Sequence, residues 1–333
     1  MRPDAGLGPV SSNQPPTAHP AASAPPEAAV GVPARPTTRS SAPTGKGTPT
    51  DPAPAERAEP PHAKRRGPGR NLPAAIGVGV ALGAVVLTTV FVVPQGFPVL
   101  VAVAMMVAVL ELTRALGEGD LQVPPVPLLV GVVGMVISTV VFGADGLLVS
   151  TAAAVCVLIL WRVSESMGLT ALRDVTGGVF TLAWVPFLGC FTLLLFGQDD
   201  GPMLVLLAIL VPVANDIGGY VAGVLFGSHP MAPGISPKKS WEGFAGSLVL
   251  GVAASTAVLV WALEQPWWVG VILGAVLVVI STCGDLAESL LKRDLGIKDM
   301  GHLLPGHGGV LDRVDSILLA APTTYILLEI LLP

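Results

Sequence analysis

The stretch from Ser289 to Asp315 reads SLLKRDLGIKDMGHLLPGHGGVLDRVD, and it joins two apolar segments, 267–284 and 314–332. Each apolar segment approaches the roughly 20 residues that a helix needs to cross a bilayer. The stretch itself is rich in Asp, Lys, Arg, His and Gly. Because ionisable groups are costly at a membrane boundary, we interpret this polar segment, 289–315, as a functional site between two membrane-spanning helices.

The composition of the whole chain places it among integral membrane proteins. Of its 333 residues, 52% are hydrophobic and only 12% are charged. A soluble domain carries about 25% charged residues. The three cysteines, Cys156, Cys190 and Cys283, show no CxxC spacing and lie in or beside apolar runs. We interpret them as small core residues rather than as disulfide partners or metal ligands.

Residues 1–70 differ from the rest of the chain. They are dominated by Pro, Ala, Ser, Thr and Gly, with almost no large apolar residue. Such a segment cannot bury enough apolar surface to offset the entropy lost on ordering. We therefore expect a disordered tail over 1–70 and a transmembrane domain over 71–333.

Apolar segments of spanning length follow one another from Leu72 onward. We place them at 73–93, 96–113, 123–142, 146–163, 178–196, 202–226, 244–263, 267–284 and 314–332. Because backbone groups in a bilayer must pair within their own segment, such spans are helices. The predicted fold class is all-α, a polytopic membrane protein with about nine transmembrane helices.

The distribution of basic residues tests the number of these spans and their orientation in the membrane. If the tail is cytoplasmic, all 18 Lys and Arg residues lie in it or on the same side of the membrane. The positive-inside rule then places the N-terminus and the polar segment in the cytoplasm and the C-terminus outside. We therefore expect a multi-pass protein of a bacterial plasma membrane whose site opens to the cytoplasm.

Two further polar clusters open to the same side. Asn215 and Asp216 lie within span 202–226, and an Asp in an apolar run is most often kept for a metal or a polar cavity. The connection after this span contains Ser236, Lys238 and Lys239, and adjacent lysines beside hydroxyls suit phosphate oxygens. Two blander interpretations stay open: a helix-packing face for the first cluster and a topology signal for the second.

The third cluster brings carboxylates from two helices towards one place. Residues spaced i, i+3, i+4 and i+7 share a helix face, and here they are Asp285, Glu288, Ser289 and Lys292. Asp312 and Asp315 share a face at the start of the last span. Asp285 and Asp312 together suit one or two Mg²⁺ ions.

The glycine-rich part of the polar segment suits an anion. Its glycines let the backbone turn sharply and present N–H groups to phosphate. The chain contains neither a GxxxxGK[ST] loop nor a GxGxxG motif after a strand, so nucleotide binding would be of another, intramembrane type. We expect phosphoryl or nucleotidyl chemistry on a lipid.

The polar segment resembles the pattern of the phosphatidate cytidylyltransferase (CDP-diacylglycerol synthase) family. The matching positions are Ser289, Leu291, Lys292, Arg293, Lys298, Asp299, Gly301, Leu304, Pro305, His307, Gly308, Gly309, Val310, Asp312, Arg313, Val314 and Asp315. The resemblance extends to Asn215–Asp216, to residues 236–243 and to Gly284–Asp285. It therefore covers roughly the C-terminal half, about 202–333, which we expect to be the catalytic half.

The resemblance implies that CTP and phosphatidate react to give CDP-diacylglycerol and pyrophosphate, a step of phospholipid biosynthesis. It implies that Asp285 and Asp312 hold the catalytic Mg²⁺, and we expect Lys292 and Arg293 to act beside them. The expected substrate-binding residues are Asn215, Asp216, Ser236, Lys238, Lys239, Lys298, Asp299, His307, Gly308, Gly309, Arg313 and Asp315. CTP would come from the cytoplasm, and phosphatidate from the inner leaflet of the membrane.

Two other functions remain as alternatives. A CTP-dependent polyprenol or lipid-alcohol kinase needs similar groups but attacks the γ-phosphorus and releases CDP. An ion-coupled transporter also uses intramembrane carboxylates, although the polar groups here cluster on one side without a polar path through the other half. No nucleic-acid partner is expected, and a homodimer stays open.

Overall fold

The computed structural model describes residues 72–165, 168–304 and 308–332. The chain divides into two units, Met1–Lys64 and Arg65–Pro333, and every described residue belongs to the second. The predicted disordered tail, 1–70, lies outside the described residues.

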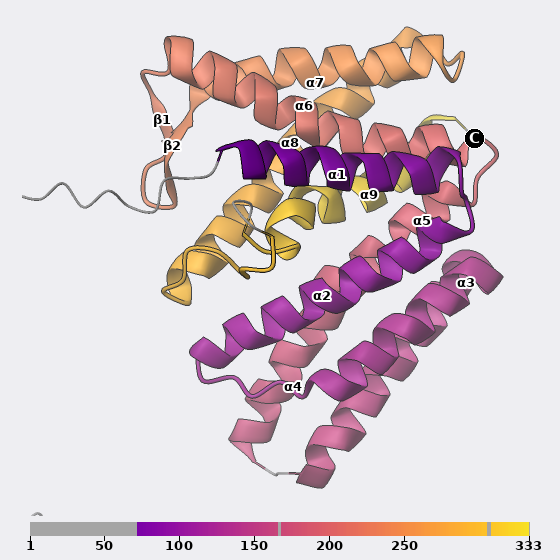
Figure 1. Cartoon of the computed structure of the whole chain (residues 1–333), viewed down its shortest axis with the longest axis vertical. Coiled ribbons are helices and arrows are strands. Elements are labelled where there is room, and N and C mark those ends of the chain that lie inside the picture. Colours follow the sequence, from indigo (N-terminus) through magenta and orange to yellow (C-terminus); the bar gives the residue numbers. More distant parts are fainter. Residues whose placement is uncertain (1–71, 166–167, 305–307, 333) are drawn as a thin grey trace, which may run out of the picture. The chain divides into compact units, whose positions relative to one another are not determined.

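Helices dominate the described chain, as predicted for an all-α fold (Figure 1). In chain order the elements are α1 (Leu72–Phe91), α2 (Gly96–Glu118), α3 (Pro125–Glu165), α4 (Leu169–Leu182), the π-helical turn η1 (Ala183–Phe187), α5 (Phe191–Phe196), α6 (Gly201–Phe226), β1 (Pro230–Ala232), β2 (Ser236–Ser240), α7 (Trp241–Trp261), α8 (Trp267–Asp294) and α9 (Leu311–Leu331). The two strands form a small antiparallel hairpin that the sequence did not indicate.

Seven helical runs in the described chain are long and apolar enough to cross a membrane. They are α2, α3, the run Leu169–Phe196, α6, α7, α8 and α9. The prediction of a polytopic membrane protein is therefore confirmed. The count of nine is not confirmed: α1 contributes only a shorter apolar helix, Gly77–Phe91, and the run of α3 covers two predicted spans on either side of a non-helical residue, Gly143.

The long helix α3 reverses direction in its middle. Gly143 has φ 64° and ψ −141°, a backbone conformation outside the helical region that glycine adopts without a Cβ penalty. The chain folds back at this residue. The contact between the arms shows it: a Cβ built on Gly131 would lie 3.0 Å from the Cβ of Ala154. The two arms of α3 therefore lie side by side (Figure 1).

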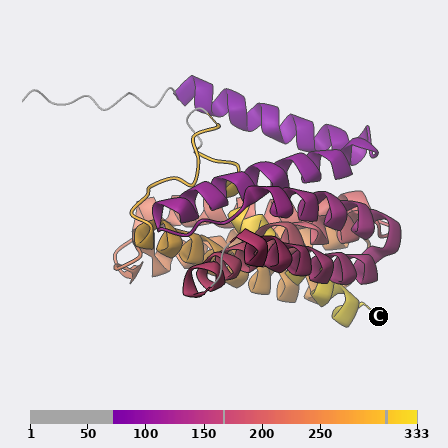
Figure 2. The same cartoon turned by 90° about the horizontal axis from the view of Figure 1, so that it is seen from below.

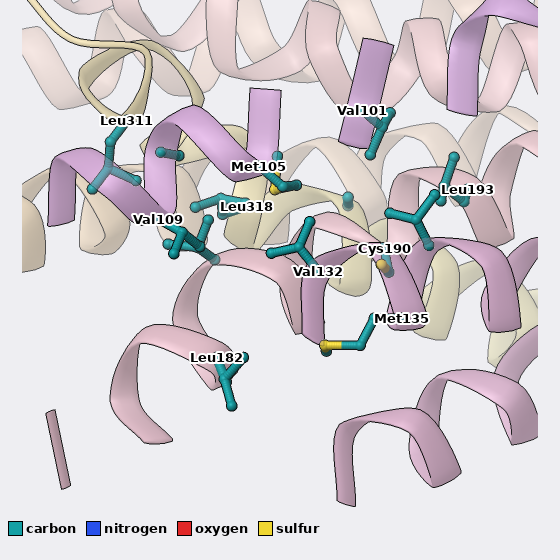
Figure 3. Packing of buried hydrophobic residues seen from close by; sticks show 14 of the residues in the cluster. Val101, Met105, Val109, Val132, Met135, Leu182, Cys190, Leu193, Leu311 and Leu318 are labelled. Carbon is teal, nitrogen blue, oxygen red and sulfur yellow. The ribbon is translucent and has the colours of Figure 1, made fainter. Parts of the chain in front are cut away.

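A hydrophobic cluster joins α9 to the first half of this unit. It includes Val101 and Val109 of α2, Val132 of α3, and Leu311 and Leu318 of α9 (Figure 3). Residues far apart in the sequence thus share one core, and the start of α9 is packed against α2. This packing matters for the site, because the last part of the polar segment leads directly into α9.

The cysteines are all free, as predicted, but only one lies in the core. Cys190 is buried in the cluster of Figure 3. Cys156 and Cys283 are exposed, so their interpretation as core residues was wrong. A helix that is apolar all round gives no periodicity from which its buried face can be predicted.

Helices α6 and α7 pack closely through small residues. A Cβ on Gly218 would lie 2.5 Å from the carbonyl oxygen of Gly246, and one on Gly219 would lie 2.7 Å from Ser247 Oγ. Neither position leaves room for a larger side chain. These small residues form a packing face on α6, and the contact brings the polar residues of α6 close to α7.

The first helix lies at the margin of the unit (Figure 2). From Gly77 onward, only Val90 of α1 is fully buried, although the helix is strongly apolar. An apolar helix with its side chains exposed is stable in lipid rather than in water. This exposure agrees with a helix that contacts the bilayer.

Candidate active site

The predicted site residues converge on one cavity of about 350 Å³, which we call the central cavity. It is lined from α6, the β1–β2 hairpin, α7, α8 and α9. The predicted residues found there are Asn215, Asp216, Lys238, Lys239, Asp285, Lys292, Asp312, Arg313 and Asp315. Three polar clusters that are separate in the sequence therefore form a single site.

Asn215 connects the three helices that form one wall of the cavity. Its Nδ2 donates to Asp216 Oδ1 at 3.2 Å, and its Oδ1 accepts from Thr282 Oγ1 of α8 at 3.2 Å. Its backbone carbonyl accepts from Ser247 Oγ of α7 at 2.6 Å. Because its polar groups are already engaged and only 4% of the residue is exposed, Asn215 orients Asp216 and holds α6, α7 and α8 together.

The β1–β2 hairpin brings lysines over the cavity. Lys239 of β2 forms an ion pair with Asp285 of α8. Ser240, directly after it, is the N-cap of α7, and its Oγ accepts from the backbone N–H of Gly243 at 3.1 Å. The sequence placed Lys238 and Lys239 in a plain connection, because a run of Ser, Pro and Lys has little preference for strands.

Glu242 fastens the other end of the hairpin. Its Oε2 accepts from the backbone N–H groups of Ser228 and His229, both at 3.2 Å. Its Oε1 lies 2.6 Å from Nδ1 of His229. The chain that leads into β1 is thereby tied to the first turn of α7, which fixes the position of the lysines on β2.

Lys292 lies between two carboxylates from different helices. Its Nζ is 2.8 Å from Glu288 Oε2 on α8 and 2.7 Å from Asp312 Oδ1 on α9. The side chains of Glu288 and Asp312 are only 3% and 2% exposed. Lys292 therefore offsets the charge of two buried acids and links the two helices on which the polar segment begins and ends.

Asp312 is the most heavily hydrogen-bonded carboxylate of the site. Besides the bond to Lys292, it accepts from the backbone N–H of Met300 at 3.1 and 3.0 Å, through Oδ1 and Oδ2. Its Oδ2 also accepts from the N–H of Gly309 at 2.7 Å. Gly308, at φ 80°, gives the turn that directs this N–H inward. Asp312 thus binds three separate parts of the polar segment, at Lys292, Met300 and Gly309.

Two acids in the central cavity complete its negative charge. Glu288, which the sequence placed on the same helix face as Asp285, has a buried Oε1 with no hydrogen-bond partner among the described residues. Asp315, one turn after Asp312, accepts from the backbone N–H of Ser316 at 2.6 Å.

Several predicted residues do not line the central cavity. Arg293 and Lys298 are exposed, and Ser236 lies at the start of β2, where it pairs with Ala232. Asp299 lines a neighbouring cavity of about 620 Å³ beside α2. Gly308 and Gly309 act through the turn at Asp312. His307 lies outside the described residues.

One buried acid from outside the C-terminal half also reaches the site. Glu111 of α2 accepts from the backbone N–H of Val310 through Oε1 at 3.0 Å and from that of Leu311 through Oε2 at 2.8 Å. Glu111 was not predicted as a site residue, because the resemblance covered only the C-terminal half. A lone carboxylate inside the apolar run 101–112 was the signal that could have identified it.

The donor set of the central cavity fits Mg²⁺. Five carboxyl groups line it, from Asp216, Asp285, Glu288, Asp312 and Asp315, against four basic side chains. In the described part of the chain, no three His, Cys, Asp or Glu side chains form a ready metal cage. Mg²⁺ is usually held by one or two carboxylates together with water and substrate phosphates, so the free Glu288 oxygen and the excess of acids agree with such a site.

Comparisons with known proteins agree on one family. The profile described as "Cytidylyltransferase family" matches residues 73–331. A phosphatidate cytidylyltransferase of Mycobacterium tuberculosis is 43% identical over 275 residues, which cover 79% of this chain and 84% of that protein. One from Mycobacterium leprae is 44% identical over 278 residues, covering 79% of this chain and 89% of that protein. One from a Synechocystis species is 42% identical over 139 residues, or 40% of this chain and 45% of that protein.

Proposed function

The chain belongs to the cytidylyltransferase family, and we propose that it transfers the cytidylyl group of CTP to phosphatidate, giving CDP-diacylglycerol and pyrophosphate. The observation that carries the proposal is the convergence of all three polar clusters on the central cavity. The family match, 73–331, includes every element that lines this cavity.

The reaction needs two phosphate-bearing substrates to meet in line. An oxygen of the phosphatidate phosphate attacks the α-phosphorus of CTP, a new P–O–P bond forms, and the bond to the β-phosphate breaks as pyrophosphate leaves. No general base is required, because the attacking phosphate monoester is already ionised at neutral pH. The protein therefore contributes positioning and charge stabilisation.

The basic side chains divide into two groups. Lys239 is paired with Asp285, and Lys292 is paired with Glu288 and Asp312. Lys238 and Arg313 also line the cavity, are exposed, and form no ion pair within the described residues. We assign the second pair to the substrate phosphates, and the first pair to holding the acids in place until substrate arrives.

The acids suit a divalent cation that accompanies the nucleotide. Asp285 and Asp312 would hold one or two Mg²⁺ ions, with Asp216 and Glu288 beside them. When bound, Mg²⁺ neutralises the charge that develops on the reacting α-phosphate and on the leaving pyrophosphate. Without a cation, Asp216 and Asp315, which form no ion pair among the described residues, would oppose the binding of a triphosphate.

The orientation proposed for the membrane follows from the charge distribution. All 18 Lys and Arg residues lie on one side of the predicted spans. With that side in the cytoplasm, CTP reaches the central cavity from the cytoplasm, and phosphatidate enters from the inner leaflet. With the three native cysteines replaced by Ser, a cysteine introduced next to Lys238 should react with an impermeant reagent in inverted vesicles and not in right-side-out ones.

The function is tested by following the label of CTP labelled at the α-phosphate, incubated with the purified protein, Mg²⁺ and either phosphatidate or a polyprenol. We expect the label to enter a lipid as pyrophosphate is released in equal amount. Label that stays in CDP while the γ-phosphate enters a lipid alcohol would replace the proposal with the kinase alternative. No turnover with either lipid class would favour a transporter.

Deleting residues 1–68 is expected to leave the transferase activity largely intact. The family match begins at residue 73, and the described residues that line the central cavity all lie between Asn215 and Ser316. We expect kcat/KM for CTP to stay within about tenfold of the full chain, a barrier difference of about 1.4 kcal/mol. The same labelled-CTP assay measures it, and a larger loss would assign residues 1–68 a part in catalysis or assembly.

A further inference from the structure

The start of α9 lacks a capping side chain of its own. The first N–H groups of any helix have no partner inside the helix and need an acceptor from elsewhere. Val310, the N-cap residue of α9, makes no side-chain cap bond. The acceptor is Glu111 of α2, whose two carboxylate oxygens bind the N–H groups of Val310 and Leu311. A residue about 200 positions earlier in the chain therefore caps this helix.

The charge of Glu111 is balanced by this position. The side chain belongs to a residue that is only 4% exposed, and no basic side chain pairs with it among the described residues. A carboxylate at a helix N-terminus is stabilised by the N–H groups and by the positive end of the helix dipole. The N–H groups at the start of α9, rather than a counter-ion, thus stabilise the buried carboxylate.

The same carboxylate lies against the polar segment. A Cβ on Gly309 would lie 2.5 Å from Glu111 Oε2, and one on Gly301 would lie still closer to Oε1. Both positions therefore require glycine as long as Glu111 occupies this place. Gly309 also donates its N–H to Asp312, and Met300, the neighbour of Gly301, does the same. Glu111 and Asp312 thus hold two adjacent parts of the same segment.

We propose that Glu111 is a positioning residue of the transferase: it holds the turn before α9 so that Asp312 faces the central cavity. The inference rests on the proposed function for the role of Asp312. Glu111 does not line the central cavity; it lines the neighbouring cavity, together with Asp299. It acts through Leu311, which directly precedes Asp312, and through the two glycines. The N-terminal half thereby contributes to a site whose other residues come from the C-terminal half.

Glu111→Gln is the test, because it keeps the shape of the side chain but turns one acceptor into a donor that faces a backbone N–H. We expect faster amide hydrogen exchange at Val310 and Leu311 in detergent or nanodiscs, with the other helices unchanged. Since a misplacement of about 1 Å can cost about 100-fold, we expect a loss of about 100-fold in kcat with KM for CTP nearly unchanged. Glu118→Gln is the matched control, because Glu118 is on the same helix, exposed and without an ion pair in the described chain.

A double-mutant cycle with Gly301 tests the contact itself. Gly301→Ala should lower kcat when Glu111 is present, since the new methyl group meets the carboxylate. In the Glu111→Ala background, Gly301→Ala should lower kcat little further, so the losses of kcat from the two substitutions are not additive. This comparison stays informative if Glu111→Gln is poorly expressed, because the cycle uses Glu111→Ala instead.

Three outcomes would overturn the inference. Unchanged amide exchange at Val310 and Leu311 in Glu111→Gln would show that Glu111 does not cap α9. Faster exchange with normal kcat would make the cap purely structural. Additive losses of kcat in the Gly301 cycle would show that Glu111 and Gly301 do not interact. If the wild-type protein turns over neither CTP nor phosphatidate, the proposed function fails, and the exchange experiment still decides whether Glu111 caps α9.

Discussion

Replacing Asp312 by Asn is expected to lower kcat by about 10³-fold, a loss typical of removing one preorganised electrostatic group from an active site. Every partner of Asp312 is a donor: the Lys292 ammonium and the N–H groups of Met300 and Gly309. The amide NH₂ of Asn would have to face one of these donors in either orientation. The substitution also removes a charge proposed to hold Mg²⁺.

The Asp312→Asn experiment needs a readout that separates chemistry from folding. The labelled-CTP assay gives kcat, and thermal unfolding in the same detergent gives stability, which we expect to fall by about 1–3 kcal/mol for the unsatisfied donors. Asp294→Asn is the matched control, because Asp294 ends α8, is exposed and lies outside the cavity. Near-normal turnover of Asp312→Asn would end its assignment to the metal, whereas a full loss of stability would mean that Asp312 acts mainly on the fold.

The parts of the site that follow helix periodicity could be predicted from the sequence. Asp285, Glu288 and Lys292 are three and four residues apart, and the structure places all three on the cavity side of α8. The same periodicity separates Arg293 from Lys292, because adjacent helical residues point about 100° apart. Arg293 was nevertheless predicted beside Lys292 from the family resemblance, and it is exposed outside the cavity.

The parts that depend on tertiary packing could not be predicted. Nothing near Glu111 in the sequence indicates that it meets Val310, because the contact depends on how α2 packs against α9. The pairing of Lys239 with Asp285 depends on the β hairpin, which the local propensities did not indicate. The reversal of α3, which lets its two arms lie side by side, depends on the conformation of one residue, Gly143.

Replacing Lys292 by Met is expected to be the second most damaging change. It would leave Glu288 and Asp312, both almost fully buried, without the ammonium that lies between them. Removing one partner of a buried ion pair usually costs about 3–5 kcal/mol, because an unpaired charge remains in a poorly solvated place. We also expect kcat to fall by about 100-fold or more, since Asp312 would lose one of the contacts that hold it. Arg173→Met is the control, an exposed basic residue on α4 outside the site.

A double variant, Lys292→Met with Glu288→Gln, separates the two roles of Lys292. Neutralising Glu288 removes one of the two buried charges, so the unfolding midpoint should recover much of its loss. The activity should not recover, because Asp312 would still lack the ammonium that holds its Oδ1. Recovery of both would mean that Lys292 serves only to neutralise Glu288. Recovery of stability alone would show that Lys292 supports catalysis through its contact with Asp312, which joins the end of α8 to the start of α9.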